Sequence, residues 1–243
     1  MTVLIESLMA DFPLLARIPT LWLQIAVVGV WLGIVLAIAG VVSRFTNSDP
    51  EIVRKIVHIG TGNVILFAWL LNIPAWVGIG ASVLAGIATL LSYRLPLLPG
   101  INSIGRKSLG TFFYAVSIGV LVAWFWAVQK PYFAALGILI MTWGDGLAAL
   151  IGQRYGKHVY TVGGVKKSWE GSLTMAVVSC IVSSAILIAV QGNTWSAWLV
   201  AFVVALVATG LEAFSWYGID NLSVPIVSAG LGFLLTQLLF PIP

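Results

Sequence analysis

Residues 141–174 read MTWGDGLAALIGQRYGKHVYTVGGVKKSWEGSLT and carry an acidic residue, Asp145, inside an apolar run. A carboxylate well inside a membrane span costs roughly 2.5 to 3.5 kcal/mol on insertion scales, so it usually marks a functional site with a charge partner. We expect that partner in the glycine-rich basic loop that follows, before the apolar sequence resumes. The polar and glycine residues of this loop are Gly152, Arg154, Gly156, Lys157, Gly163, Gly164, Lys166, Lys167, Ser168 and Glu170.

This loop combines the groups that bind a nucleotide. Backbone amides at glycines, lysine ammonium groups and a carboxylate that binds a divalent cation are what a metal-bound triphosphate needs. Asp145 also shares a helical face with Ala148, Ala149 and Gly152, whose small size lets a metal or ligand come close. The stretch therefore predicts a nucleotide site at a membrane surface. The alternative is a structural aspartate paired with a lysine.

The composition around this stretch is that of an integral membrane protein. The 243 residues are 60% hydrophobic and 8% charged, with a mean hydropathy of +1.06, whereas soluble domains carry about 25% charged residues. Apolar runs of about 20 residues, long enough to cross a bilayer as helices, recur along the chain. We therefore predict an all-α, polytopic transmembrane helical bundle that forms a single domain over residues 1–243. About eight spans are expected, with seven also possible, at 21–43, 53–71, 74–93, 109–128, 131–151, 170–190, 195–213 and 223–240.

The N-terminal residues 1–20 are expected to form an interfacial segment. They do not read as a signal peptide, because Glu6 and Asp11 stand where a basic region is required. The one cysteine, Cys180, excludes an intrachain disulfide. Zinc is not expected either, because the two histidines lie far apart in the sequence.

The charges predict the orientation of the bundle. Ten of the twelve Lys and Arg residues fall in three long loops, and by the positive-inside rule that side is cytoplasmic. No basic arm or soluble basic face is present to bind nucleic acid. Most acidic residues fall at the same face: Asp49, Glu51, Asp145, Glu170, Glu212 and Asp220. A topology signal with a few solvated acids explains the basic residues, but it explains poorly the acids that lie within or against spans.

A second group of charges begins the predicted span at 53–71. Glu51, Arg54, Lys55 and His58 are spaced three or four residues apart, so they share one side of a helix. A histidine directed into a span is usually functional. The alternative is an interfacial Glu–Lys pair with a histidine present by chance. Near the last span, Asp220 and Asn221 either belong to the site or only cap the final helix.

Several of these motifs together resemble the polyprenol kinase family, which includes phytol kinase, dolichol kinase and the CTP-dependent diacylglycerol kinases. The resemblance covers about residues 50–230 and is closest to the short phytol kinase branch. The matching motifs, in order, are Arg54, Lys55 and His58; Gly110 and Thr111 with Tyr114; Gly144, Asp145 and Gly146 with Ala148, Gly152 and Gly156; Lys167, Ser168, Glu170, Gly171 and Ser172; and Asp220 and Asn221 with Pro225.

The resemblance implies transfer of a phosphoryl group from CTP or UTP to an isoprenoid alcohol, with phytol as the first candidate. It also implies a magnesium requirement and a place in phytol salvage towards tocopherol or phylloquinone. A bacterial inner membrane, a thylakoid membrane or a plastid-type membrane would hold the enzyme, with its active site on the cytoplasmic side.

Phosphoryl transfer depends mainly on positioning and charge neutralisation, and we assign roles on that basis. The candidate catalytic residues are His58, Asp145, Lys167, Glu170 and Asp220. The candidate magnesium ligands are Asp145, Glu170 and Asp220. The candidate residues that bind the triphosphate or orient the alcohol are Arg54, Lys55, Gly152, Gly156, Lys166, Ser168 and Asn221. His58 or a carboxylate would accept the proton of the alcohol.

Three other functions are alternatives. One is a CTP-dependent diacylglycerol or dolichol kinase of the same family. The central stretch also resembles the signature of phosphatidate cytidylyltransferases, which make CDP-lipids, but it has Gly164 and Val165 where Ser-Pro is expected. The Arg54, Lys55 and His58 motif favours the kinases. A transporter would place charges near the midplane within paired repeats, and no paired halves are visible in this sequence.

Overall fold

The structure is a computed structural model, and it describes residues 19–45, 50–92 and 109–239. Within these ranges the chain is helical apart from one short hairpin and the connections. Strands β1 (Val159–Val162) and β2 (Val165–Ser168) pair antiparallel, with Val159 opposite Ser168. The helices are α2 (Thr20–Phe45), α3 (Pro50–Gly62), α4 (Val64–Leu70), α5 (Ala75–Ser92), α7 (Gly110–Ala127), α8 (Pro131–Leu139), the π-helix η2 (Ile140–Asp145), α9 (Gly146–Tyr155), α10 (Trp169–Gln191), α11 (Trp195–Ala213) and α12 (Asp220–Leu239).

Seven helices in the described ranges are long and apolar enough to cross a bilayer, which confirms the prediction of an all-α polytopic bundle. One of the seven is the continuous run α8–η2–α9. The expected span at 53–71 is not a single long helix, because α3 and α4 meet at Asn63. The Asn63 side chain donates to the carbonyl of Ile59 at 3.0 Å and so competes with the backbone ladder. The expected interfacial segment lies almost entirely outside the described residues, as does Asp49.

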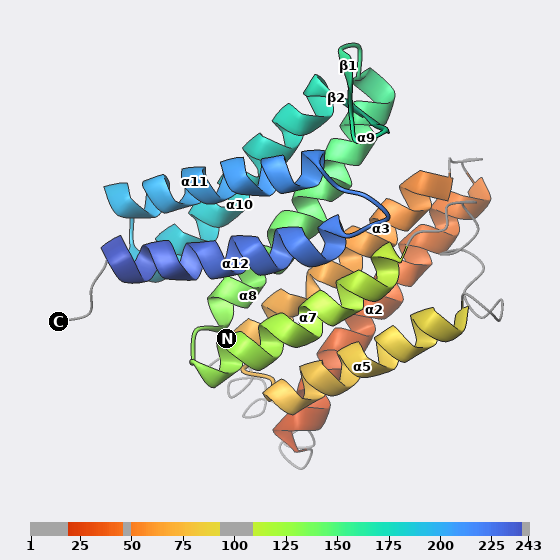
Figure 1. The fold of residues 1–243 in the computed structure, drawn as a ribbon. Helices are drawn as coiled ribbons and strands as arrows, with labels where there is room; N and C mark the ends of the chain where they lie inside the picture. Colours follow the sequence, from red (N-terminus) through yellow and green to blue (C-terminus); the bar gives the residue numbers. More distant parts are fainter. Residues whose placement is uncertain (1–18, 46–49, 93–108, 240–243) are drawn as a thin grey trace.

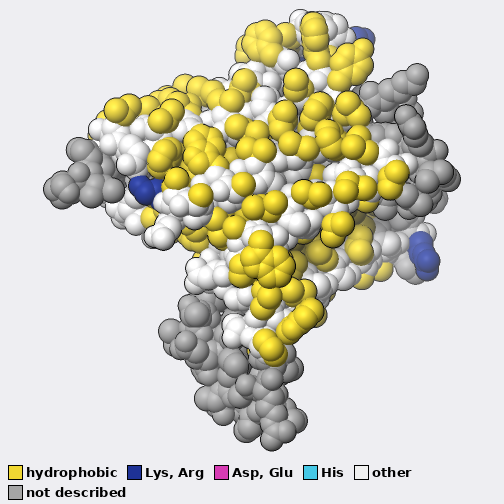
Figure 2. Space-filling view, turned by 60° about the horizontal axis from the view of Figure 1, so that its bottom comes forward, with side chains coloured by type: hydrophobic (Ala, Val, Ile, Leu, Met, Phe, Trp, Pro, Cys, Tyr) yellow, Lys and Arg dark blue, Asp and Glu magenta, His cyan; other side chains and the backbone are white. Residues whose placement is uncertain are grey.

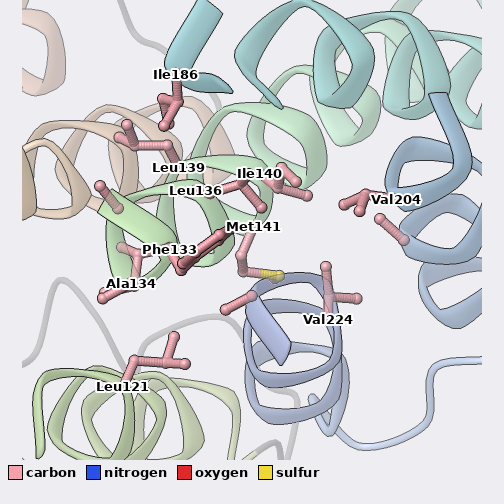
Figure 3. Packing of buried hydrophobic residues seen from close by; sticks show 14 of the residues in the cluster. Leu121, Phe133, Ala134, Leu136, Leu139, Ile140, Met141, Ile186, Val204 and Val224 are labelled. Carbon is pink, nitrogen blue, oxygen red and sulfur yellow. The ribbon is translucent and has the colours of Figure 1, made fainter. Parts of the chain in front are cut away.

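The run α8–η2–α9 is the centre of the bundle. Figure 1 shows it passing between α10, α11 and α12 on one side and α2, α3, α5 and α7 on the other. Every residue of α8 from Phe133 to Leu139 is buried. Figure 3 shows Leu136, Ile140 and Met141 among residues of α10, α11 and α12. The apolar sequence of α8 thus serves as a core that the other helices surround.

Gly137 lets α8 and α12 come into backbone contact. A side chain at this position would collide with the backbone of Pro225 in α12. Pro225 has no N–H group, so the carbonyl of Asn221, four residues earlier, receives no helical hydrogen bond from it. The first turn of α12, which carries Asp220 and Asn221, is therefore less constrained than an ordinary helical turn.

The outer surface of the bundle is apolar. Figure 2 shows one face covered by hydrophobic side chains, with few Lys or Arg. Large hydrophobic residues on α2, α5 and α10 are exposed, among them Val30, Leu84 and Ile181. Such a surface suits contact with lipid and agrees with the membrane assignment.

Candidate active site

Asp145 ends the π-helix η2 and forms an ion pair with Lys55 of α3. The Lys55 Nζ atom lies 2.5 Å from Asp145 Oδ2, and the two side chains are only 4% and 14% exposed. The expected charge partner therefore exists, but it comes from α3 and not from the loop that follows Asp145. The order of residues in the sequence does not reveal this partner, because α3 packs alongside η2 only in the fold. Loss of either partner of such a buried pair is strongly destabilising, since the remaining charge would stay buried alone.

His58 lies one turn after Lys55 and faces the same carboxylate. Its Nε2 atom is 4.0 Å from Asp145 Oδ2 and has no hydrogen-bond partner in the described part of the chain, although it is buried. The imidazole packs against the Tyr114 ring with centroids 4.5 Å apart. Tyr114 in turn is hydrogen-bonded to Thr142 of η2, at 2.8 Å between the hydroxyl oxygens. A buried polar atom without a partner usually has a functional reason, and here it borders the carboxylate of Asp145.

Arg54 occupies the outer part of the same helical face. Its Nε atom donates to Glu51 Oε2 at 2.9 Å, and a second hydrogen bond joins its Nη2 atom to Glu51 Oε1. The interfacial pair on this face is therefore between Glu51 and Arg54, while Lys55 turns inward to Asp145. Arg54 also interacts electrostatically with Asp145 and Asp220. The three-and-four spacing thus brings Arg54, Lys55 and His58 together, as predicted.

The hairpin separates the two adjacent lysines. Side chains alternate along a strand, so on β2 Lys166 is exposed while Lys167 faces the bundle. Lys167 Nζ donates to the carbonyl of Glu212 at 3.1 Å and also to its carboxylate. Glu212, at the end of α11, is buried. The structure therefore brings Lys167 to the site and leaves Lys166 on the other side of the hairpin.

Ser168 joins the hairpin to α10. Its hydroxyl oxygen accepts a hydrogen bond from the Gly171 backbone N–H at 3.2 Å and so caps α10. Side chains at Gly152 or Gly156 would press against Ser168, so these glycines let α9 and the hairpin approach α10. These contacts give all three residues a packing role, and their predicted contact with nucleotide stays a prediction.

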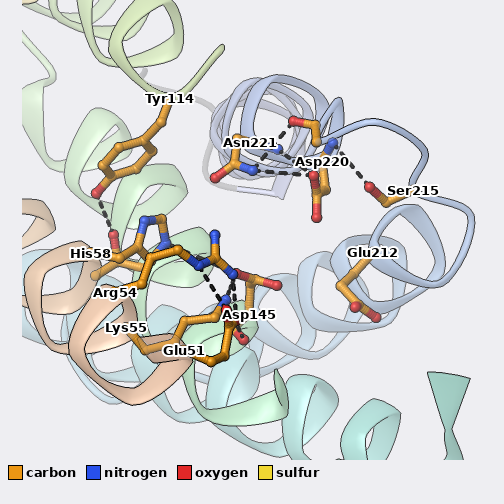
Figure 4. Close-up of polar contacts among 12 residues, drawn as sticks. Glu51, Arg54, Lys55, His58, Tyr114, Asp145, Glu212, Ser215, Asp220 and Asn221 are labelled. Atoms are coloured by element: carbon orange, nitrogen blue, oxygen red, sulfur yellow. Dashed lines mark hydrogen bonds and ion pairs between the residues drawn. The ribbon is translucent and has the colours of Figure 1, made fainter. Parts of the chain in front are cut away.

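Asp220 and Asn221 form the polar first turn of α12. Asp220 accepts hydrogen bonds at its Oδ1 atom from the backbone N–H of Asn221 at 3.1 Å and from the Asn221 side chain at 3.2 Å. The Asp220 backbone N–H donates to the Ser215 hydroxyl at 3.4 Å. Asp220 is buried and interacts electrostatically with Asp145 and Lys167. Figure 4 shows Asp145, Glu212 and Asp220 around one space with Arg54 and Lys55.

Glu170 lies apart from this cluster. Its Oε1 atom is 2.7 Å from His158 Nδ1, and the His158 side chain is 77% exposed. This contact joins the start of the hairpin to the first turn of α10. Among the described residues, no three His, Cys, Asp or Glu side chains are grouped as ligands of one metal ion. Asp145 and Asp220 lie around the space that Figure 4 shows and interact electrostatically with each other and with Glu212.

Sequence reasoning left Glu212 out of the candidate site residues. The available signal was its position, since an acid at the end of an apolar span needs a partner. That partner could not be named, because Lys167 lies 45 residues earlier in the chain. Tyr114 enters the sequence analysis only as part of a motif with Gly110 and Thr111, and its ring contact with His58 depends on how α7 packs.

Comparison with known proteins identifies the family of this chain. The phytol kinase of Synechocystis sp. is 52% identical over 209 residues, which cover 86% of this chain and 90% of that protein. The chain belongs to the phytol kinase family. This confirms the resemblance that the sequence motifs indicated.

More distant members of the phytol kinase family come from plants. Phytol kinase 1, chloroplastic, of Arabidopsis thaliana is 26% identical and is matched over 84% of this chain and 72% of its own length. Farnesol kinase, chloroplastic, of the same plant is 27% identical, with 77% and 66% covered. No family model and no solved structure matches the chain. The names of these relatives share one chemistry, the phosphorylation of an isoprenoid alcohol.

Proposed function

We propose that this chain transfers the γ-phosphoryl group of CTP or UTP to the terminal hydroxyl of a membrane isoprenoid alcohol, with phytol as the preferred acceptor. The observation that carries the proposal is the convergence of charged groups from five elements. These are Arg54, Lys55 and His58 from α3, Asp145 from η2, Lys167 from β2, Glu212 from α11 and Asp220 from α12. The names of the relatives support the acceptor class.

The reaction forms a bond between the alcohol oxygen and the γ-phosphorus and breaks the bond from that phosphorus to the β,γ-bridging oxygen. The nucleoside diphosphate leaves, and the alcohol proton passes to a base. His58 Nε2 and the Asp145 carboxylate are the candidate bases, because both border the same buried space. A base must come within hydrogen-bond reach of the proton that it accepts, so we place the alcohol hydroxyl beside these two groups.

Arg54 and Lys167 would bind the phosphates in this proposal. Both are cations with polar contacts at the water-facing end of the site, and both interact electrostatically with Asp145 and Asp220. Charge-assisted hydrogen bonds to phosphate are among the stronger polar contacts in proteins. Lys167 would have to exchange its contact with Glu212 for one with the triphosphate.

Magnesium fits the acids of this site. Mg²⁺ is usually held by one or two carboxylates together with substrate phosphates, and Asp145 and Asp220 provide two that interact electrostatically. The ion would neutralise charge on the phosphates. We leave Glu170 out of the proposed ligand set because its carboxylate forms an ion pair with His158, apart from Asp145.

The site would open to the cytoplasm. The hairpin that carries Lys166 and Lys167 borders the end of α11, where Lys167 contacts Glu212, and the positive-inside rule assigns the basic end of the spans to the cytoplasm. A nucleotide would then reach the hairpin from water while the alcohol stays in the bilayer. We place the enzyme in a bacterial inner membrane, a thylakoid membrane or a plastid-type membrane.

The test uses purified full-length chain in lipid vesicles with Mg²⁺ and CTP labelled either at the γ-phosphate or in the cytosine ring. The acceptors are phytol, geranylgeraniol, diacylglycerol and phosphatidate. We expect γ-label to appear in phytol and in geranylgeraniol. Cytosine label in a lipid product would instead identify a cytidylyltransferase and would refute the proposal, as would transfer to diacylglycerol alone.

A further inference from the structure

Two irregular points in the helices face each other beside the charged cluster. The helical run of α3 and α4 is interrupted at Asn63, and the central run widens into the π-helix η2 over Ile140–Asp145. The Trp143 indole nitrogen donates to the Asn63 side-chain oxygen at 3.0 Å, so the two points are joined directly. Single π-helical turns inside α-helices are frequent at functional sites. The wide turn here orients side chains toward two different surroundings.

One of these surroundings is an apolar groove of about 320 Å³ between α4, the central run and α10. Its volume is at the lower end of the range of about 300–1,000 Å³ typical of small-molecule sites. The lining includes Asn63, Leu66, Leu139, Trp143, Val182 and Ile186. Asn63 is the polar member of this set, and its side-chain oxygen accepts from Trp143. The groove therefore suits hydrocarbon.

The groove begins next to the candidate active site. Thr142 precedes Trp143 and is buried on the other side of η2, where it contacts the Tyr114 hydroxyl beside His58. Asp145 follows two residues after Trp143. Asn63 lies five residues after His58, which is about 7.5 Å along the axis at the rise of a helix. Two lining residues, Asn63 and Trp143, are thus close in the chain to His58 and Asp145, respectively.

We infer that this groove binds the hydrocarbon chain of the alcohol acceptor, with the hydroxyl directed to His58 and Asp145. The inference rests on the proposed function. An amphiphile with one polar end and an apolar tail matches the polarity of the site, which is charged at His58 and Asp145 and apolar beyond Trp143. Leu66, Leu139 and Val182 would contact the tail within the bilayer.

The test fills the groove and compares long with short acceptors. Val182→Phe adds a ring on the groove side of α10. Ala185 also lines the groove, so Ala185→Phe is a second variant in case the first folds poorly. With a twenty-carbon isoprenoid alcohol we expect KM to rise at least tenfold. With the five-carbon alcohol 3-methyl-2-buten-1-ol, which is too short to reach far into the groove, kcat/KM should stay within twofold of the wild-type value.

Val177→Phe is the matched control, because Val177 lies on the same helix and is 50% exposed without lining the groove. This control should leave KM and kcat/KM unchanged for both acceptors. The inference is overturned if the groove variants behave like this control, which would make the groove ordinary lipid-facing surface. Equal losses for long and short acceptors would overturn it too, because the substitution would then act on the charged site.

A second measurement separates this inference from the proposed function. A twenty-carbon isoprenoid alcohol with a diazirine near the middle of its chain is photolysed with wild-type protein in vesicles without nucleotide. We expect crosslinks to the α10 segment around Val182 and Ile186, and loss of these crosslinks in Val182→Phe but not in Val177→Phe. Crosslinks elsewhere would refute the groove even in an active kinase. Wild-type protein that crosslinks here but transfers no phosphate would refute the proposed function alone.

Discussion

Lys55–Asp145 and Lys167–Glu212 are both lysine–carboxylate pairs with little exposure to solvent, but they join different parts of the molecule. The first links α3 to the central run and lies beside His58, which packs against Tyr114. The second links the hairpin to the end of α11. Lys55 is 4% exposed and Lys167 is 19% exposed. This difference fits our proposal that the first pair serves the chemical step and the second binds the nucleotide.

Loss of the first pair should have the largest effect. Asp145→Asn removes a candidate base and magnesium ligand and leaves the Lys55 charge without its partner. Because one electrostatic contact in an active site is worth about 100- to 1,000-fold, we expect kcat to fall at least about 1,000-fold. Transfer of γ-labelled phosphate measures this, and membrane insertion should be unchanged. Normal turnover would show that Asp145 has no catalytic role.

Loss of the second pair should act on the nucleotide. Lys167→Met keeps the length of the side chain and removes its charge. Hydrogen bonds to charged groups contribute about 1.5–3 kcal/mol, so KM for CTP should rise about 10- to 100-fold with little change in KM for the alcohol.

Lys166→Met is the control for that variant, because its side chain faces away from the site on the same strand. It should leave both constants within about twofold. If the two lysine variants weaken nucleotide binding equally, the strand register does not decide which lysine contacts the nucleotide.

Glu170→Gln should have a smaller effect than either pair. Its contact with His158 is largely exposed, and exposed ion pairs contribute about 0–1 kcal/mol. We expect activity within about threefold of wild type and an unchanged magnesium dependence. A loss as large as that of Asp145→Asn would restore Glu170 to the magnesium ligands that the sequence predicted.

Ser168→Ala should change stability and leave the chemistry nearly intact. Loss of the side-chain cap of α10 costs about 1 kcal/mol, which thermal unfolding in detergent should detect as a lower Tm. Thr194→Ala removes the equivalent cap of α11 far from the site and is the matched comparison. A fall in kcat only for Ser168→Ala would indicate that its hydroxyl contacts substrate.

Much of this arrangement could be predicted from the sequence. The apolar runs locate the spans, because length and composition alone decide whether a helix can cross a bilayer. The charges on Arg54, Lys55, His58 and Asp145 mark the site, because acids and bases inside spans need partners. The approach of Asp220 to Asp145 agrees with the expectation that distant acids meet at one face.

Other features depend on tertiary contacts that no local pattern encodes. The sequence predicts that both lysines of the basic loop bind nucleotide, and a four-residue strand is too short to show the alternation that separates Lys166 from Lys167. The break at Asn63 interrupts a run whose hydropathy is that of one span. Glu212 gains its partner from a hairpin 45 residues away. In each case the deciding neighbour is distant in the chain.

The π-helical turn η2 has one further consequence. Thr142 and Asp145 face the polar interior while Trp143 faces the groove. The nucleotide would therefore approach this turn from water, and the alcohol would approach it from the bilayer. Neither substrate then blocks the path of the other. Initial-rate kinetics should accordingly show a ternary complex assembled in either order. The phosphorylated product would diffuse laterally in the leaflet, and the nucleoside diphosphate would leave into water.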